Sequence, residues 1–350
     1  MYKHGGDIYL NENKNDFSTN INLAGIPEGV IRAACEGVML SDRYPDTECS
    51  DLRKAISKAI GIPAEQIICG NGAADLIYSI VLALKPNKAL MPVPAFYEYE
   101  QALKIIECEI EYIPMREELH FILQEDFIDR IKEDTDIIFL CNPNNPTGNL
   151  IDKDLMHRII HKCETDGIWL VVDECFMDFV EHRKDYSVMD QCENAKHLFI
   201  LKAFTKLYAM PGLRLGYGVC GNMELLKSMK KVSQPWNVSI PAQMAGIAAL
   251  EEEKYVTDSL ELIKREKDYL IEELQKLNYR VYGSRANYLF FHAYPGLYAM
   301  CLEKGILIRD CSNYQGLKEG YYRIAIKRHE DNEQLIKALR EVDNLWQNQL

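Results

Sequence analysis

Lys206 and Arg214 stand eight residues apart in a segment of aromatic, aliphatic and glycine residues, where a solvated charge is not expected. Removing a lysine from water lowers its pKa and makes its free amine a better nucleophile. The planar guanidinium of an arginine binds phosphate oxygens through paired hydrogen bonds. This spacing therefore predicts a reactive amine close to a bound phosphate.

A second anion-binding feature is indicated by residues 69–75, Cys-Gly-Asn-Gly-Ala-Ala-Asp, which link a predicted strand to a predicted helix. A glycine turn at that place directs backbone N–H groups and the positive end of the helix at a phosphate. The alternative is an ordinary strand-to-helix turn, since the third glycine of a dinucleotide-binding loop is missing.

Two more polar segments follow predicted strands. Residues 141–148 contain two Asn-Pro steps, which favour a tight loop that holds the Asn145 amide above the end of a strand. The apolar run 168–172 ends in Asp173 and Glu174, and a carboxylate there stays ionised only beside a cation or a strong donor. The alternatives are a plain turn for the first segment and a helix cap or a metal ligand for the second. We expect no metal, because no cluster of His or Cys at metal-ligand spacing accompanies Asp173.

These groups fit one cofactor. A reactive lysine, a cradle for a phosphate and an acid for a ring nitrogen are what a protein supplies to pyridoxal 5′-phosphate (PLP). The sequence therefore predicts a PLP site.

The elements that must bring these segments together follow an α/β pattern. Between residues 50 and 220, short apolar runs alternate with segments of helical period, which is typical of parallel strands with crossover helices. Expected strands are 66–69, 89–92, 109–113, 136–141, 168–173 and 197–201, and expected helices are 75–84, 98–106, 124–133 and 153–165. In such a sheet, ligands bind at the carboxyl ends of the strands, where the polar segments lie.

The order of elements changes in the last third of the chain. After a further apolar run at 213–220 we expect helices at 243–253, 255–277, 296–304 and 330–346, and strands at 280–282, 288–291, 306–309 and 321–326. This order predicts an α+β domain. We expect residues 1–44 to form an arm packed on this smaller domain, residues 45–250 to form a large α/β domain, and residues 251–350 to form the smaller C-terminal domain.

Composition restricts the partners and the compartment. The net charge of −13 and the absence of a dense run among the 40 basic residues argue against nucleic acid and anionic membranes as partners. Eleven cysteines without a C-x-x-C pair argue against disulfides and a zinc cage. Neither an apolar signal core nor a run of ~20 apolar residues is present, so we expect a cytoplasmic protein.

With these segments in place, the chain resembles fold-type I PLP enzymes of the class I/II aminotransferase group over essentially its whole length. The resemblance implies a three-layer α/β fold like that of aspartate aminotransferase, with a smaller α+β domain. It implies that Lys206 carries the cofactor as a Schiff base and later moves a proton at the substrate Cα, and that Asp173 pairs with the pyridinium. The other cofactor-binding residues implied are Asn145 at the ring O3′, Phe96 stacked on the ring, Thr205 beside the lysine, and Ala73, Ala74, Arg214 and Tyr44 at the phosphate. Tyr44 would come from a neighbouring subunit, which implies a homodimer.

The chain departs from the group at two positions. Ala203 stands where the group often has Ser or Thr, so one phosphate hydrogen bond has to come from elsewhere. Phe176 stands where many aminotransferases have a tyrosine, so the ring O3′ loses a phenol donor. The second departure argues against the usual electronic tuning of an aminotransferase.

Three segments narrow the reaction. His4-Gly5-Gly6, residues 16–22 and residues 308–314 resemble threonine-phosphate decarboxylases of the cobalamin pathway, which also carry the phenylalanine. Histidinol-phosphate aminotransferases share the central motifs but lack the glycine pair and the Arg-Asp-Cys-Ser-Asn stretch. The favoured hypothesis is therefore decarboxylation of L-threonine phosphate to aminopropanol phosphate. The alternatives are an aminotransferase acting on histidinol phosphate or another amino acid, and a non-catalytic PLP-binding protein.

The resemblance also implies a substrate site. Arg323, assisted by Asn20, would bind the substrate carboxylate, and His4, Gly5, Gly6 and Arg309 are candidates for a distal phosphate. The alternatives are a frayed terminus for His4 and surface charges at strand ends for the two arginines. A PLP enzyme breaks the Cα bond that is perpendicular to the ring, so the same residues allow decarboxylation or transamination, depending on how the substrate is rotated.

Overall fold

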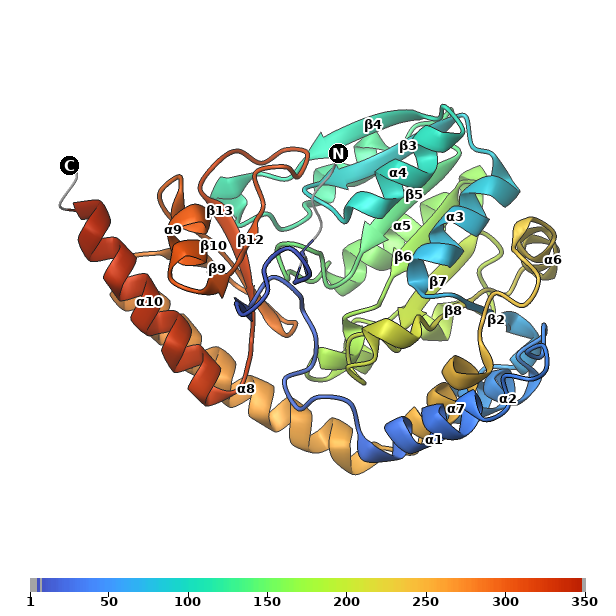
Figure 1. Ribbon diagram of the computed structural model, residues 1–350. Coiled ribbons are helices and arrows are strands. Elements are labelled where there is room, and N and C mark those ends of the chain that lie inside the picture. The colour runs from blue at the N-terminus through green and yellow to red at the C-terminus, as the bar shows by residue number, and fades with distance from the viewer. Residues whose placement is uncertain (1–4, 7, 348–350) are drawn as a thin grey trace.

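The computed structural model describes residues 5, 6 and 8–347 and has a large and a small domain (Figure 1). The large domain is built on a seven-stranded sheet in the order β2-β8-β7-β6-β5-β3-β4. The strands are β2 Ile67–Gly70, β3 Lys88–Val93, β4 Glu109–Pro114, β5 Ile137–Cys141, β6 Trp169–Asp173, β7 Leu198–Ala203 and β8 Gly216–Val219. All are parallel except β8, which runs antiparallel to both of its neighbours.

Helices cover both faces of this sheet, which explains why its central strands are almost continuously apolar. One face is packed by α3 Ala73–Leu84, α4 Tyr97–Ile105 and α6 Met223–Val232. The other is packed by α2 Ser50–Ile60, α5 Lys153–Asp166 and α7 Ile240–Ala249. The predicted three-layer fold is therefore confirmed.

The small domain is an antiparallel sheet in the order β12-β13-β10-β9 with helices against it. Its strands are β9 Arg280–Tyr282, β10 Tyr288–His292, β12 Arg309–Asp310 and β13 Tyr321–Ala325, and its helices are α8 Glu253–Lys276, α9 Leu297–Glu303 and α10 His329–Gln347. The long helix α8 runs from the α1 side of the molecule to the small sheet, where α10 lies along it (Figure 1).

The N-terminal segment is divided between the two domains. Strand β1 Asn15–Asp16 pairs in parallel with β11 Ile306–Leu307 of the small domain. Helix α1 Glu28–Val38 instead packs against α7, where Gly37 lies so close to Pro241 that a Cβ would be 2.7 Å from its Cα. The arm expected over residues 1–44 thus packs on the small domain only in its first part. The domain boundaries themselves remain a prediction.

Some local predictions were wrong. Residues 124–133 form only a 3₁₀ turn, Glu125–Arg130, in which Phe127 is the one buried side chain, so there is no apolar face to stabilise a helix. The strand expected at 306–309 is split into β11 and β12, which join different sheets. Helices α1, α2 and α6 were not predicted. Across the described residues, no helix is long and apolar enough to cross a membrane, and no group of three His, Cys, Asp or Glu is placed to hold a metal.

Candidate active site

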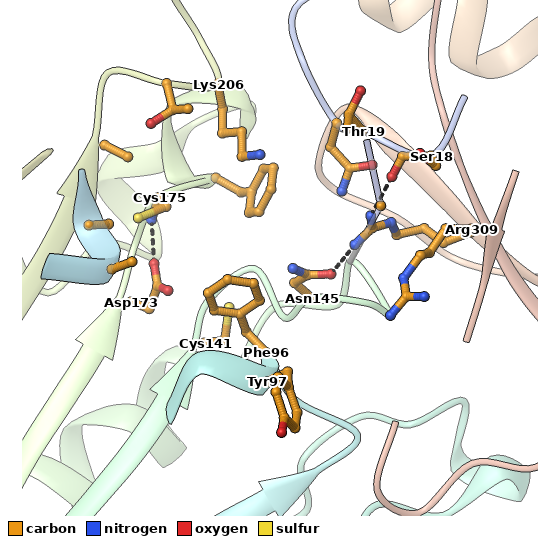
Figure 2. A pocket seen from close by; sticks show the side chains of 18 of the residues that line it. Ser18, Thr19, Phe96, Tyr97, Cys141, Asn145, Asp173, Cys175, Lys206 and Arg309 are labelled. Carbon is orange, nitrogen blue, oxygen red and sulfur yellow. Dashed lines mark hydrogen bonds between the residues drawn. The ribbon is translucent and has the colours of Figure 1, made fainter. Parts of the chain in front are cut away.

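A cavity of about 250 Å³ lies between the two domains, at the carboxyl ends of β5, β6 and β7. Figure 2 shows Asp173, Cys175 and Lys206 on one side of it and Ser18, Thr19 and Arg309 on the other. The predicted site residues that line it are Gly5, Asn20, Ala73, Ala74, Phe96, Asn145, Asp173, Thr205, Lys206, Arg214, Arg309 and Arg323. The fold thus brings together residues from positions 5 to 323, as expected for a ligand site at the strand ends.

Asp173 ends β6 and is 5 % exposed. Its carboxylate accepts hydrogen bonds from the Tyr99 hydroxyl at 2.5 Å and from the Cys175 backbone N–H at 2.9 Å, the latter drawn in Figure 2. Burial and the nearby carboxylate raise the pKa of Tyr99, which keeps the phenol protonated as a donor. These two donors compensate for the loss of water around the Asp173 carboxyl group, which is placed to pair with a cationic ring nitrogen.

Lys206 follows β7, and its ammonium nitrogen lies 5.8 Å from the centre of the Phe176 ring. Burial, together with the positive charge of Arg323, lowers the pKa of Lys206 to about 8. A larger fraction of the side chain is therefore a neutral amine near pH 7 than for an exposed lysine. Only the neutral amine attacks a carbonyl carbon, so this environment suits a lysine that binds an aldehyde.

The expected phosphate cradle is a close contact between the start of α3 and Arg214. Gly72 has φ +85°, and a Cβ on it would lie 2.5 Å from Nη2 of Arg214. A Cβ on Gly216 would lie 2.5 Å from the backbone nitrogen of Ala73. The two glycines therefore allow the guanidinium and the first helical N–H groups to converge, which is an arrangement that binds phosphate.

Two arginines from the small domain form the opposite wall. Arg309 on β12 and Arg323 on β13 are directly paired neighbours, and they are 9 % and 6 % exposed. Arg323 donates to the side-chain oxygen of Asn145 and, at 2.8 Å, to the backbone oxygen of Ser18. Such buried guanidinium groups are suited to carboxylate or phosphate.

Two polar atoms of this wall have no hydrogen-bond partner within the described part of the chain. They are the side-chain oxygen of Asn20 and Nε of Arg323. Buried polar atoms are normally paired, so a polar ligand is expected here. Nε of Arg323 can donate to an anionic group, and the side-chain oxygen of Asn20 can accept from an amine. Together with the phosphate cradle, the buried acid and the lysine, these atoms fit PLP and an anionic amino acid.

Of the predicted glycine pair, Gly5 lines the cavity and Gly6 does not. The Gly6 N–H donates to the Ser18 hydroxyl oxygen at 2.7 Å, and a Cβ on Gly5 would lie 2.5 Å from the Ser18 carbonyl oxygen. Asp16 fixes this segment by accepting from the hydroxyls of Ser18 and Thr19, at 2.6 and 2.7 Å. His4 lies outside the described residues.

Tyr44 does not line the cavity of its own chain. It is 75 % exposed and stacks on Trp236 with ring centres 4.3 Å apart. This position is compatible with a role in another subunit.

Sequence reasoning gave no individual role to several residues of the site, although Ser18, Thr19, Asn313 and Tyr314 lie in segments that it singled out. Asn313 accepts from Arg309 at 2.9 Å, and Tyr314 lies under the same guanidinium at 5.2 Å. Ser18, Thr19, Tyr97, Cys141 and Cys175 also line the cavity. A usable signal was the short distance in sequence between Arg309 and Asn313, because a turn after a strand often folds back on the strand end.

The two departures from the group also lie in the cavity wall. Ala203 contributes only a methyl group there. Phe176 packs edge-on against Tyr288, with ring centres 5.0 Å apart, and the Tyr288 hydroxyl donates to the Asn144 carbonyl at 2.7 Å. The phenylalanine is therefore part of the packing that supports the Asn145 loop.

The family assignment agrees with this geometry. Residues 8–339 match the family described as "Aminotransferase class I and II", and the chain belongs to that family. The enzymes of this family use PLP.

Two decarboxylases and an aminotransferase are among the similar proteins. The threonine-phosphate decarboxylase of Salmonella typhimurium is 36% identical over 93% of this chain and 90% of its own length. The structure of the histidinol-phosphate aminotransferase from Clostridium acetobutylicum has a TM-score of 0.88 and 33% identity, covering 94% of this chain and 98% of that one. The structure of L-threonine-O-3-phosphate decarboxylase from Porphyromonas gingivalis has a TM-score of 0.81 and 25% identity, covering 93% of this chain and 98% of that one.

Proposed function

We propose that this chain is a PLP-dependent lyase that converts L-threonine phosphate to aminopropanol phosphate and carbon dioxide. The observation that carries the proposal is the pair of buried arginines, Arg309 and Arg323, which face Lys206 across a small cavity. L-threonine phosphate carries a carboxylate and a phosphate on a short skeleton, so one molecule can use both cations. The similarity to the Salmonella and Porphyromonas decarboxylases supports the same substrate.

The residues have distinct tasks in this proposal. Bound PLP supplies a conjugated ring that accepts the electron pair left at Cα when a bond perpendicular to the ring breaks. Asp173 would hold the ring nitrogen in its protonated form, and the Asn145 amide would donate at the ring O3′. Phe96 would cover the ring, and Ala73, Ala74, Thr205 and Arg214 would hold the cofactor phosphate.

The substrate is held from the small domain. Arg323 and Asn20 bind its carboxylate, and Arg309 binds its phosphate together with the Gly5 amide and His4. The Gly6 amide, expected to bind the phosphate as well, instead donates to the Ser18 hydroxyl and holds this segment in place. The Cα–carboxylate bond breaks, carbon dioxide leaves, and Cα takes up a proton in its place. Lys206 is the base and acid of the cavity, because its pKa of about 8 lets Nζ hold or release a proton near neutral pH.

The second candidate function is transamination of histidinol phosphate. It is supported by the similarity to the Clostridium aminotransferase across nearly the whole chain. Histidinol phosphate carries a phosphate but no carboxylate, so it would occupy only one of the two arginines. The other arginine would be left for the carboxylate of the second amino acid in the transamination. Phe176 argues against this candidate, because it offers no hydroxyl at the tyrosine position.

The assembly and the location are part of the proposal. We infer a homodimer in which Tyr44 contacts the cofactor phosphate of the neighbouring subunit, since its exposed ring does not reach its own cavity. All eleven cysteines are free thiols, which supports the reducing cytoplasm. The name of a similar protein, an adenosylcobalamin biosynthesis bifunctional protein of Leptospira interrogans, supports a role in cobalamin synthesis.

The test is to mix the PLP-loaded enzyme with L-threonine phosphate and to follow carbon dioxide and cofactor absorbance together. Release of carbon dioxide with a stable absorbance of the aldehyde form supports the decarboxylase. Conversion of the cofactor to its amine form without gas identifies an aminotransferase. A protein that shows no PLP–lysine absorbance band would be a non-catalytic binder.

A further inference from the structure

Glu117 joins the two domains outside the cavity. It lies in the turn Glu117–Leu119 that follows β4 of the large domain. Its carboxylate accepts hydrogen bonds from the hydroxyls of Tyr282 at 2.6 Å and Tyr321 at 2.5 Å, and it forms an ion pair with Arg280 at 3.1 Å. All three donors belong to the small sheet. Hydrogen bonds from the two tyrosines lower the pKa of Glu117, so the carboxylate is ionised at neutral pH.

An aromatic contact strengthens the same junction. Phe121, four residues after Glu117, is 3 % exposed and inserts its ring among aromatic rings of the small sheet. Its ring centre lies 5.1 Å from that of Tyr282, 5.6 Å from that of Phe290 and 5.7 Å from that of Tyr321. Edge-on aromatic contacts of this kind add to the burial of apolar area. The loop 117–121 is therefore anchored to the small sheet by both a charge and a ring.

The strand register connects this junction to the substrate arginines. Arg309 is paired with Arg323, Arg323 with Phe290, and Phe290 with Tyr282. Directly opposite residues on antiparallel strands project from the same face of a sheet. One row of side chains thus places two arginines in the cavity at one end and two aromatic rings against the loop 117–121 at the other. Tyr321, two residues before Arg323 on β13, shares this face.

We propose that Glu117 is a positioning residue that fixes the distance of Arg309 and Arg323 from Lys206 and Asp173. The large domain supplies Lys206, Asp173 and Glu117, and the small sheet supplies the arginines and the three donors. The four strands of the small sheet are hydrogen-bonded to one another and move as a unit. Fixing Tyr282 at one end of the row of side chains therefore also fixes Arg309 and Arg323 at the other end. The inference rests on the proposed function for the identity of the anionic substrate, but the junction itself does not depend on it.

The Glu117 junction is the useful one to test because it does not touch the ligand. Two other links between the domains, from Tyr288 to Asn144 and from Arg285 N–H to Gly148 O, act directly on the loop that carries Asn145. Glu117, in contrast, does not line the cavity. A change at Glu117 therefore reports on domain position rather than on a lost ligand contact.

The experiment compares the variants Glu117→Ala, Glu117→Gln and Tyr321→Phe with the parent enzyme. The matched control is Glu273→Gln, which removes a carboxylate that pairs with Lys276 and Arg340 inside the small domain. Calorimetry gives the Kd of L-threonine phosphate on enzymes whose PLP–lysine link has been reduced with borohydride, so that the compound binds without being converted. Absorbance of the untreated enzymes gives the amount of bound cofactor. We expect Glu117→Ala to raise Kd about tenfold, as for the loss of hydrogen bonds to a charged group. The other two junction variants should raise it less, and all four should bind PLP as the parent does.

A second measurement separates this inference from the proposed function. Arg323 lowers the pKa of Lys206 through its charge, so moving the small sheet away raises that pKa. The rate at which the cofactor-free protein captures PLP, measured against pH, should therefore have a higher midpoint in Glu117→Ala. If the parent enzyme does not bind L-threonine phosphate, the proposed substrate is wrong, and the midpoint still tests the junction. An unchanged midpoint, or an unchanged Kd where the parent binds, overturns the positioning role of Glu117.

Discussion

Arg323 of the small domain donates a hydrogen bond to the side-chain oxygen of Asn145 of the large domain. Because the oxygen is occupied, the NH₂ group is the end of the Asn145 amide that is left to donate to a ligand. The same arginine lowers the pKa of Lys206. One residue thus connects the expected carboxylate site, the expected cofactor contact and the reactive amine.

Replacing Arg323 should affect the substrate far more than the fold. We expect Arg323→Gln to raise KM for L-threonine phosphate about 100-fold, because a buried charge pair loses one partner. Arg328→Gln is the control, since this exposed arginine donates to backbone oxygens of the N-terminal segment, at 3.2 Å to Leu23 O and at 3.4 Å to Ala24 O. Steady-state kinetics of both variants test this. A KM that changes equally in both variants would show that Arg323 has no special role in binding.

The protonation of Lys206 should set how the cofactor-free protein reacts with PLP. Only the neutral amine reacts, so the capture rate should rise with pH through a midpoint near 8, which is the pKa of Lys206. A positive neighbour disfavours the protonated form, so removing it in Arg323→Gln should move the midpoint up toward the usual lysine value of about 10.4. Stopped-flow absorbance over a pH series measures both midpoints. A midpoint that falls in the variant contradicts the assigned electrostatics.

The glycine pair should be needed for substrate binding and not for stability. A Cβ on Gly5 would lie 2.5 Å from the Ser18 carbonyl oxygen, so Gly5→Ala should push the N-terminal segment away from the cavity. We expect a rise of about tenfold in KM, comparable to the loss of one or two hydrogen bonds, with an unchanged Tm. Gly283→Ala is the control, because nothing lies within 4 Å of its added Cβ. A lower Tm in Gly5→Ala would point instead to a structural role.

Subunit mixing tests the place of Tyr44. If Tyr44 completes the site of the neighbouring subunit, Tyr44→Ala and Lys206→Ala chains should each be weakly active alone and should regain activity when they are refolded together. In a mixed dimer, the subunit with an intact Lys206 receives an intact Tyr44, whereas the other site carries both defects. Sedimentation confirms the dimer, and activity against mixing ratio gives the result. Absence of any recovery places Tyr44 in its own subunit or outside the site.

The strands that carry the chemistry were predictable because burial on both faces leaves a plain signal in sequence. The run that ends in Asp173 is apolar up to that residue, the run that precedes Lys206 is apolar except for the buried Lys202, and both form central strands. The helix expected at 124–133 failed for the opposite reason, since one buried ring in a surface loop has no repeating apolar face. The direction of β8 was also hidden, because an apolar run has the same composition in a parallel and an antiparallel strand.

The sequence by itself determined the chemical groups of the site: the lysine, the acid, the glycine turn and the Asn-Pro loop each follow a strand or begin a helix. Their meeting at one edge of the sheet follows from the parallel order of those strands. Only the tertiary structure decided how the small domain faces them. The pairing of Arg309 with Arg323, the bond from Arg323 to Asn145 and the contact of Glu117 with Tyr282 and Tyr321 all join residues far apart in the chain. Such contacts depend on the packing of one domain against the other, which no local pattern encodes.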